Sequence, residues 1–205
     1  MKKIDFKKEF KHLYSPSAKE AMIIDVPKMN FLLVDGKGDP NNSKEFQDAV
    51  QVLYGVTFTV KFALKKTKLG PEYTVPPLEG LWRMADNRLF NMQDKKSLLW
   101  TLMIMQPSHI TKAHVTDAIK KLSVKKPNEA LSKIRLESFH EGLTVQIMHI
   151  GPYSAESSTI EKLHNFAKNQ GYNLRGNHHE IYLSDPRKSA PEKMKTILRH
   201  PIQKI

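Results

Sequence analysis

The sequence predicts an α+β fold made of two similar halves that meet at a cleft. A strand, a turn rich in glycine and proline, a helix and two further strands occur twice, with turns at 36–40 and 151–154, about 115 residues apart. With 205 residues, the chain is long enough to bury a hydrophobic core without stabilisation by disulfides or bound metals. It contains no cysteine, which excludes a disulfide framework and thiolate chemistry.

The first half opens with two expected strands, at 22–27 and 29–35, and the second strand ends in the turn Gly36–Pro40. The Gly-x-Gly pair in this turn does not make a dinucleotide-binding fingerprint, because Asn41 stands where the next glycine would be. Ser43 then caps a helix whose apolar residues recur at helical spacing.

A hairpin is expected next, and it contains both tryptophans of the chain. Its strands are 78–84 and 98–106, and this pairing allows Trp82 and Trp100 to share a face. Buried indole N–H groups require hydrogen-bond partners, so this unit is a candidate wall for a binding site. Two helical segments then link the halves, at about 111–122 and 128–134.

The second half repeats the plan of the first. A strand at 141–150 leads through the turn into a helix at 155–169, and strands around 178–185 and 194–199 follow. We therefore expect one domain in which two repeats are joined by a helical linker. The expected boundaries are an N-terminal extension at 1–20 and a domain at 21–205, with repeats at about 21–107 and 136–205.

The charge distribution argues against nucleic acid as the primary partner. The formal net charge is +12, but the basic residues fall in small groups along the whole chain. None of these groups alternates with aromatic residues, as a base-stacking platform requires. The N-terminus lacks an apolar signal region, and no apolar run approaches the length that spans a bilayer. We expect a cytoplasmic protein without a membrane partner, and the oligomeric state is left open.

The segment 178–186 is the most informative stretch. Read as a strand, it places Ile181 and Leu183 on one face and His178, Glu180, Tyr182 and Ser184 on the other. A carboxylate and an aromatic hydroxyl on one sheet face suit the floor of a pocket for a cation or a water molecule. The alternative from this stretch alone is a half-exposed strand with a polar side.

No metal or cofactor is expected from the motifs. The segment from His179 begins like the His-Glu-x-x-His zinc motif, but Leu183 replaces the second histidine and the segment is a strand. His140, His149 and His178 have no recognised ligand spacing relative to His179. The chain also lacks a Gly-x-Ser-x-Gly elbow, so a serine nucleophile has no support.

Several segments together resemble the GyrI-like small-molecule-binding family. They are the strand before Gly151-Pro152-Tyr153, the helix after it and, above all, 179–186; segments 34–40 and 198–202 resemble the stand-alone branch. The resemblance covers about residues 20–205 and implies a pseudo-symmetric pair of βαββ units around an aromatic cleft with a buried glutamate. In members fused to transcription regulators, the cleft binds lipophilic cations. Only about 20 residues precede the first expected strand here, too few for a helix-turn-helix domain.

The stand-alone branch is known for hydrolysing strained, cyclopropane-bearing electrophiles, so the resemblance implies two alternative functions. The first is a hydrolase of lipophilic aromatic molecules, and the second is a module that binds or sequesters such molecules without turnover. In the first, Glu180 activates water and Tyr182 or Tyr153 assists. Trp82, Trp100, Tyr153 and Tyr182 are expected to line one pocket. The expected substrate-binding residues are Trp82, Trp100, Tyr54, Phe58 and His149.

Overall fold

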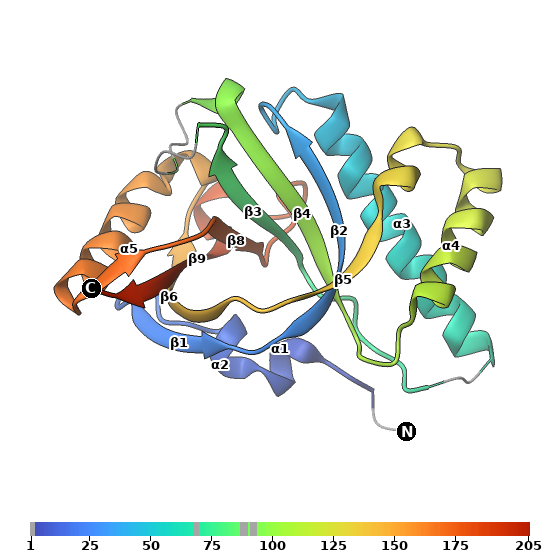
Figure 1. Ribbon diagram of the computed structural model, residues 1–205, viewed down its shortest axis with the longest axis horizontal. Helices are drawn as coiled ribbons and strands as arrows, with labels where there is room; N and C mark the ends of the chain where they lie inside the picture. The colour runs from blue at the N-terminus through green and yellow to red at the C-terminus, as the bar shows by residue number, and fades with distance from the viewer. Residues whose placement is uncertain (1–2, 68–69, 87–89, 91–93) are drawn as a thin grey trace.

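The computed structural model describes residues 3–67, 70–86, 90 and 94–205, and its centre is one large antiparallel sheet (Figure 1). The strands lie in the order β1-β6-β9-β8-β3-β4-β2-β5, and β7 pairs with β9. Their bounds are β1 Met22–Val26, β2 Met29–Lys37, β3 Leu78–Met84, β4 Leu98–Gln106, β5 Arg135–Phe139, β6 Gly142–Ile150, β7 Tyr172–Leu174, β8 His178–Tyr182 and β9 Lys195–Lys204. The α-helices are α1 Phe6–Glu9, α2 Lys11–Tyr14, α3 Lys44–Thr67, α4 Lys112–Lys125 and α5 Ser157–Asn169.

The strand order confirms the predicted pair of βαββ units. One unit is β2-α3-β3-β4 and the other is β6-α5-β8-β9, and they join where β3 pairs with β8, Gly80 opposite Glu180. Each unit is preceded in the chain by one more strand, and these two strands pair with the opposite units. Strand β1, which precedes the first unit, pairs with β6 of the second, and β5, which precedes the second unit, pairs with β2 of the first. Strand β5 was not predicted from the sequence, and the segment predicted as a helix before it forms only a 3-10 turn, Glu129–Lys133.

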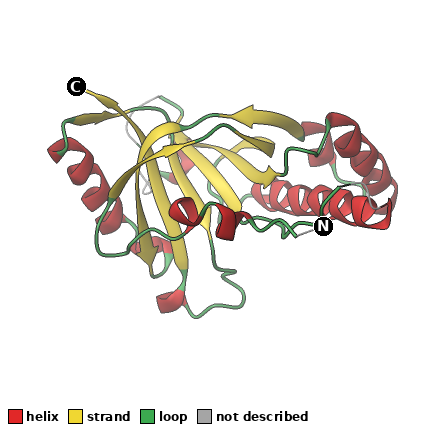
Figure 2. Ribbon diagram, turned by 90° about the horizontal axis from the view of Figure 1, so that it is seen from below, coloured by secondary structure: helices red, strands yellow, loops and turns green. Residues whose placement is uncertain are grey.

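Helices α3 and α5 cover the two ends of one sheet face. Ser43 Oγ accepts a hydrogen bond from the Phe46 amide at 3.2 Å and caps the start of α3, as predicted. Helix α3 then packs on β2 and β4, and α4 packs on α3. Helix α5 packs on β6, β7 and β9. The central strands β3 and β8 therefore lie between the two helices (Figure 1), and the second view shows helices at both ends of the sheet (Figure 2).

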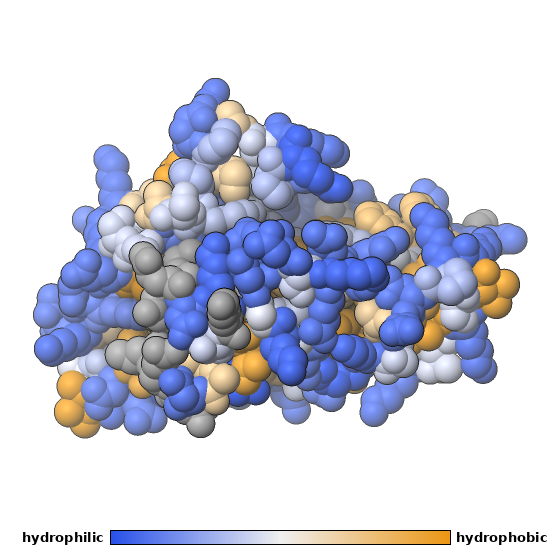
Figure 3. Space-filling view, turned by 90° about the horizontal axis from the view of Figure 1, so that it is seen from above, coloured by the Kyte–Doolittle hydropathy of each residue, from blue (hydrophilic) through white to orange (hydrophobic). Residues whose placement is uncertain are grey.

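The opposite sheet face carries a second core, covered by the N-terminal segment. Leu13 and Tyr14 of α2 are buried there, and they pack in a cluster with Phe31, Met103 and Ile181. Both faces of β8 are therefore buried, although the sequence predicted one core face. In the described part of the chain, no helix combines the length and apolarity needed to cross a membrane. The face seen from above is mostly hydrophilic, with small separate hydrophobic patches (Figure 3).

Candidate functional site

A chain of two hydrogen bonds fixes the carboxylate of Glu180 in the middle of the sheet. Trp82 Nε1 donates to the Tyr182 hydroxyl at 3.1 Å, and this hydroxyl donates to Glu180 Oε2 at 2.7 Å. Glu180 is only 5% exposed. The predicted alternation along β8 is correct, because it places Glu180 and Tyr182 on the face between α3 and α5.

Gly80 makes room for this hydrogen-bonded chain. It pairs directly with Glu180, and an added Cβ would lie 2.9 Å from Trp82 Nε1 and 3.1 Å from the Tyr182 oxygen. Any larger residue would force these two groups to move. A glycine within a strand often marks such a close approach.

Tyr153 stands beside Tyr182, at the turn that precedes α5. The two ring centroids are 5.7 Å apart and the rings meet edge to face at 79°. Burial raises the pKa of Tyr153 to about 12, with smaller contributions from the charges of Glu156 and Glu180. Burial and then the Glu180 charge raise the pKa of Tyr182 well above its usual value. Both hydroxyls therefore keep their protons at neutral pH and can donate hydrogen bonds.

Glu156, which was not predicted from the sequence, supplies a second buried carboxyl group beside Glu180. It stands at the N-cap position of α5 without making a capping hydrogen bond, and it is fully buried. Neither of its carboxyl oxygens has a hydrogen-bond partner among the described residues. Burial raises its pKa to about 9, and the charge of Glu180 adds to the rise; nearby Thr196 lowers it slightly. Glu156 is therefore protonated at neutral pH. An acidic residue at a helix start has an ordinary explanation in the helix dipole, so sequence alone gave no signal.

The two tryptophans share a sheet face, as predicted, but they lie on different strands, and only Trp82 is on the strand that pairs with β8. Trp82 and Trp100 are directly opposite on β3 and β4. The Phe46 ring stacks on Trp82 with centroids 6.0 Å apart and meets the edge of Trp100 at 5.2 Å. An added Cβ on Gly36 would lie 2.1 Å from Trp100 Cη2, so the indole packs directly on that backbone. Trp82 thus contacts the Glu180 group through Tyr182, whereas Trp100 lies one strand further away, on β4.

Tyr54 and Phe58 lie on α3, on an aromatic stripe that reaches the surface. The Tyr54 and Phe58 rings stack with centroids 6.3 Å apart, and Phe58 stacks on Phe62 at 6.1 Å. Phe58 is 40% exposed and Tyr54 is partly buried. Burial raises the pKa of Tyr54, and Asp185, in the loop after β8, adds to the rise. Tyr54 therefore lies between the exposed stripe and the end of β8.

His149 uses both ring nitrogens to hold the turn before α5. Nδ1 lies 2.9 Å from Thr159 Oγ1 and Nε2 lies 3.3 Å from the Pro152 carbonyl oxygen. The register places His149 opposite Thr196, which is opposite Tyr182, so all three share one sheet face. His149 is thus two strands away from Tyr182 and supports the turn that carries Tyr153.

His179 points to the opposite sheet face, into a buried charged network. Its Nε2 is 3.0 Å from Glu79 Oε2 and its Nδ1 is 2.9 Å from Glu141 Oε1. Burial alone would lower the pKa of His179, but the two carboxylates outweigh it and raise the pKa to about 9. Tyr14 donates to Glu79 at 3.1 Å, and Arg199 Nη1 lies 3.8 Å from Glu141. This network joins the N-terminal segment to both units.

The four histidines considered from the sequence do not gather. His179 and His149 have the partners described above, and His140 is exposed. Instead, His164 of α5 and His200 of β9 approach His178. Burial lowers the pKa of His164 to about 4 and that of His200 to about 2, with neighbouring histidines adding to both shifts.

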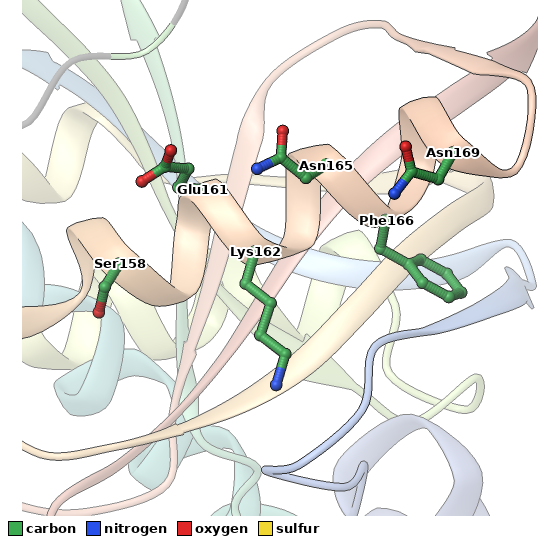
Figure 4. A pocket seen from close by; sticks show the side chains of 6 residues that line it. All are labelled: Ser158, Glu161, Lys162, Asn165, Phe166 and Asn169. Carbon is green, nitrogen blue, oxygen red and sulfur yellow. The ribbon is translucent and has the colours of Figure 1, made fainter.

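Two surface hollows lie away from these groups. One, of about 470 Å³, follows the outer face of α5 (Figure 4) and is open to solvent. Its lining residues are Ser158, Glu161, Lys162, Asn165, Phe166 and Asn169. A much smaller hollow lies beside Tyr73 and Gly70. Glu180 and its aromatic neighbours line neither hollow. Although the hollow on α5 is larger, it lacks the convergent buried polar groups of a binding site, so the Glu180 group is the better candidate.

The chain is an α+β domain with a buried carboxylate among aromatic side chains, and comparison with known proteins identifies its family. The chain matches the GyrI-like small molecule binding domain over residues 19–203. It therefore belongs to the GyrI-like family, as the sequence predicted. No curated protein matches the chain.

Three similar crystal structures come from Listeria innocua. An uncharacterized conserved protein is 44% identical, with a TM-score of 0.91 and coverage of 98% of this chain and 100% of the relative. Two structures described as hydrolases are 43% and 42% identical, with TM-scores of 0.88 and 0.86 and the same coverage. The C-terminal domain of EcmrR shares the fold at 14% identity, with a TM-score of 0.57 and coverage of 91% and 98%. The stand-alone relatives are thus much more similar to this chain than the regulator domain.

Proposed function

We propose that the protein is a hydrolase that adds water to strained electrophiles on lipophilic aromatic molecules, with Glu180 as the base. The observation that carries the proposal is the Glu180 carboxylate, held at 2.7 Å by Tyr182 beside a second buried carboxyl group whose pKa is raised to about 9. A buried carboxyl group with a raised pKa is a typical proton donor in acid–base catalysis. The hydrolase relatives at 42% and 43% identity support the same reaction class.

The proposed chemistry uses one proton acceptor and one proton donor. In a cyclopropane conjugated to a carbonyl group, Glu180 removes a proton from water while the water oxygen bonds to a ring carbon. The bond between that carbon and its ring neighbour breaks, and its electron pair moves through the conjugated system to the carbonyl oxygen. Protonated Glu156 or the Tyr153 hydroxyl then supplies a hydrogen bond or a proton to that oxygen. The product is the water adduct of the substrate.

Aromatic side chains are proposed to hold the planar part of the substrate. Trp82 is closest to the reacting group, because its indole N–H is bonded to Tyr182. Tyr54 and Phe58 extend the aromatic surface outward along α3. Trp100 reaches a ligand directly only if the Phe46 ring moves, and His149 contributes by holding the turn of Tyr153.

A binding module without turnover is the second candidate. Its support is the same carboxylate, because an anion among aromatic rings also suits a lipophilic cation. The two candidates differ in what happens to the ligand. A hydrolase releases many water adducts per protein molecule, whereas a binding module returns unchanged ligand in stoichiometric amounts.

The test measures turnover and affinity in matched variants. We would incubate the protein with a panel of cyclopropane-bearing aromatic electrophiles and count water adducts by mass spectrometry. Glu180→Gln is expected to lose about 10²- to 10⁴-fold in turnover, because it removes the base, and to keep ligand affinity within about tenfold. Glu161→Gln, on the outer face of α5, is the control and should behave like the unmodified protein. Full turnover in Glu180→Gln would remove this residue from the mechanism, and no turnover across the panel would favour the binding module.

A further inference from the structure

Three histidines from three different elements converge next to the Glu180 group. His164 comes from α5, His178 from β8 and His200 from β9, and one ring nitrogen of each lies within 4.8 Å of the others. The pairing of β8 with β9 continues from His179 opposite Arg199, so His178 and His200 lie side by side on the α5 face. The His164 ring meets His200 edge to face, with centroids 5.0 Å apart at 83°.

These histidines lack the partners that buried imidazoles normally have. His178 is 1% exposed and His200 is 3% exposed. Among the described residues, His164 Nε2, His200 Nδ1 and both ring nitrogens of His178 have no hydrogen-bond partner. Most buried polar atoms in proteins are hydrogen-bonded, so three imidazoles with unpaired nitrogens at one place are unusual. This differs from His149 and His179, where both nitrogens are used.

The neighbours fix the His178 ring without giving either nitrogen a hydrogen bond among the described residues. Phe90 stacks on this ring with centroids 4.4 Å apart and planes nearly parallel at 8°. On the edge, His178 Nε2 lies 3.3 Å from Glu180 Oε1, outside hydrogen-bond geometry. A carboxylate oxygen therefore lies beside the three imidazoles.

We propose that His164, His178 and His200 bind a divalent transition-metal ion of the zinc class, with Glu180 next to it as a further ligand or as the base for its water. Three imidazoles and one oxygen form a donor set that suits Zn²⁺, whereas Mg²⁺ and Ca²⁺ prefer all-oxygen sites. Zinc–nitrogen bonds of about 2.0–2.1 Å require nitrogens about 3.3 Å apart in a tetrahedral site. The ring nitrogens, which lie up to 4.8 Å apart, therefore have to approach one another by up to about 1.5 Å on binding. His164 is partly exposed, so its side chain is less confined than those of the buried His178 and His200.

The metal proposal is independent of the hydrolase proposal, although the two are compatible. Bound Zn²⁺ lowers the pKa of its water to about 7, which would place hydroxide beside Glu180. A site that binds metal without turnover would separate the two proposals. The experiment therefore measures metal binding itself.

The test uses the full chain after treatment with a chelator. We expect calorimetry with ZnCl₂ to show one ion per chain with micromolar or tighter affinity. CoCl₂ should produce the visible absorption of a tetrahedral, nitrogen-rich site. His164→Ala should weaken zinc binding by at least about 100-fold, more than the 10- to 100-fold typical of lost outer partners. His140→Ala, which removes an exposed histidine, is the control and should bind zinc as the unmodified chain does.

The outcomes decide the proposal even if a variant is unstable. The Co²⁺ spectrum of the unmodified chain needs no variant, and His164→Gln provides a second substitution of similar size. No stoichiometric zinc binding by the unmodified chain would overturn the proposal. Equal binding by folded His164→Ala and unmodified protein would also overturn it, because the ion would then lie elsewhere.

Discussion

A single methyl group added at Gly80 would test how the Glu180 site is held. The new Cβ of Gly80→Ala would lie 2.9 Å from Trp82 Nε1, about 0.5 Å closer than the 3.4 Å at which ordinary contact begins. It would also press on the Tyr182 hydroxyl. Because both atoms belong to the hydrogen-bonded chain, we expect a loss of about 1–3 kcal/mol in the free energy of unfolding. Displacing Tyr182 should also reduce turnover by about 10- to 100-fold, because catalytic geometry tolerates little movement.

Urea unfolding followed by circular dichroism, together with the mass-spectrometric turnover assay, would measure both effects. Gly38→Ala is the matched control, because nothing lies within 4 Å of its added Cβ. Its φ of 89° makes alanine cost about 1–2 kcal/mol, but turnover should be unchanged. In a Tyr182→Phe background, which lacks the hydroxyl, Gly80→Ala should cost less. An equal cost in both backgrounds with normal turnover would refute the reasoning.

Two further predictions concern pH and stability. The pKa of Glu156 is about 9 in the folded chain, against an ordinary value of 4.5. The folded state therefore holds this proton more tightly than the unfolded state does. The resulting contribution to the free energy of unfolding is complete below about pH 4.5 and is lost as pH rises toward 9. Glu156→Gln should therefore be more stable than the unmodified chain by roughly 2 kcal/mol or more near pH 8 and similar near pH 5, as measured by urea unfolding. The pKa of His179 is raised from 6.5 to about 9 in the folded chain. Its contribution to the free energy of unfolding is therefore complete below about pH 6.5 and is lost as pH rises through 9. Glu79→Gln should cost about 3 kcal/mol near pH 6 and reduce this alkaline loss, and an unchanged pH profile would contradict the assignment.

The sequence predicted the fold and one half of the candidate site for a clear physical reason. Local periodicity determines which residues share a strand face, so it placed Glu180 and Tyr182 together and Trp82 beside Trp100. The two βαββ units could also be predicted, because the same order of strand, Gly/Pro turn and helix occurs twice in the sequence, about 115 residues apart. These features depend only on neighbours along the chain or on repetition.

The remaining features depend on which strands pair and how helices lie across them. Glu156 becomes unusual only because the start of α5 is buried close to Glu180. His164 and His200 meet His178 only because β8 pairs with β9 and α5 crosses that pair. The exchange of β1 and β5 between units likewise follows from packing at the sheet edges. Spacing in the sequence carries none of this information.

The pairing register also explains why a repeated scaffold has only one such glutamate. If the pseudo-twofold axis passes between Gly80 and Glu180, position 80 of β3 is equivalent to 180 of β8 and Trp82 is equivalent to Tyr182. On the outer side, Trp82 is opposite Trp100 and Tyr182 is opposite Thr196, so the two units carry different residues at these positions. Two glutamates at the axis would bring like charges together, which disfavours ionisation of both. Gly80 in the first unit therefore leaves room beside Glu180 of the second unit. The first unit also supplies the Trp82 indole N–H, which donates to the Tyr182 hydroxyl that holds Glu180.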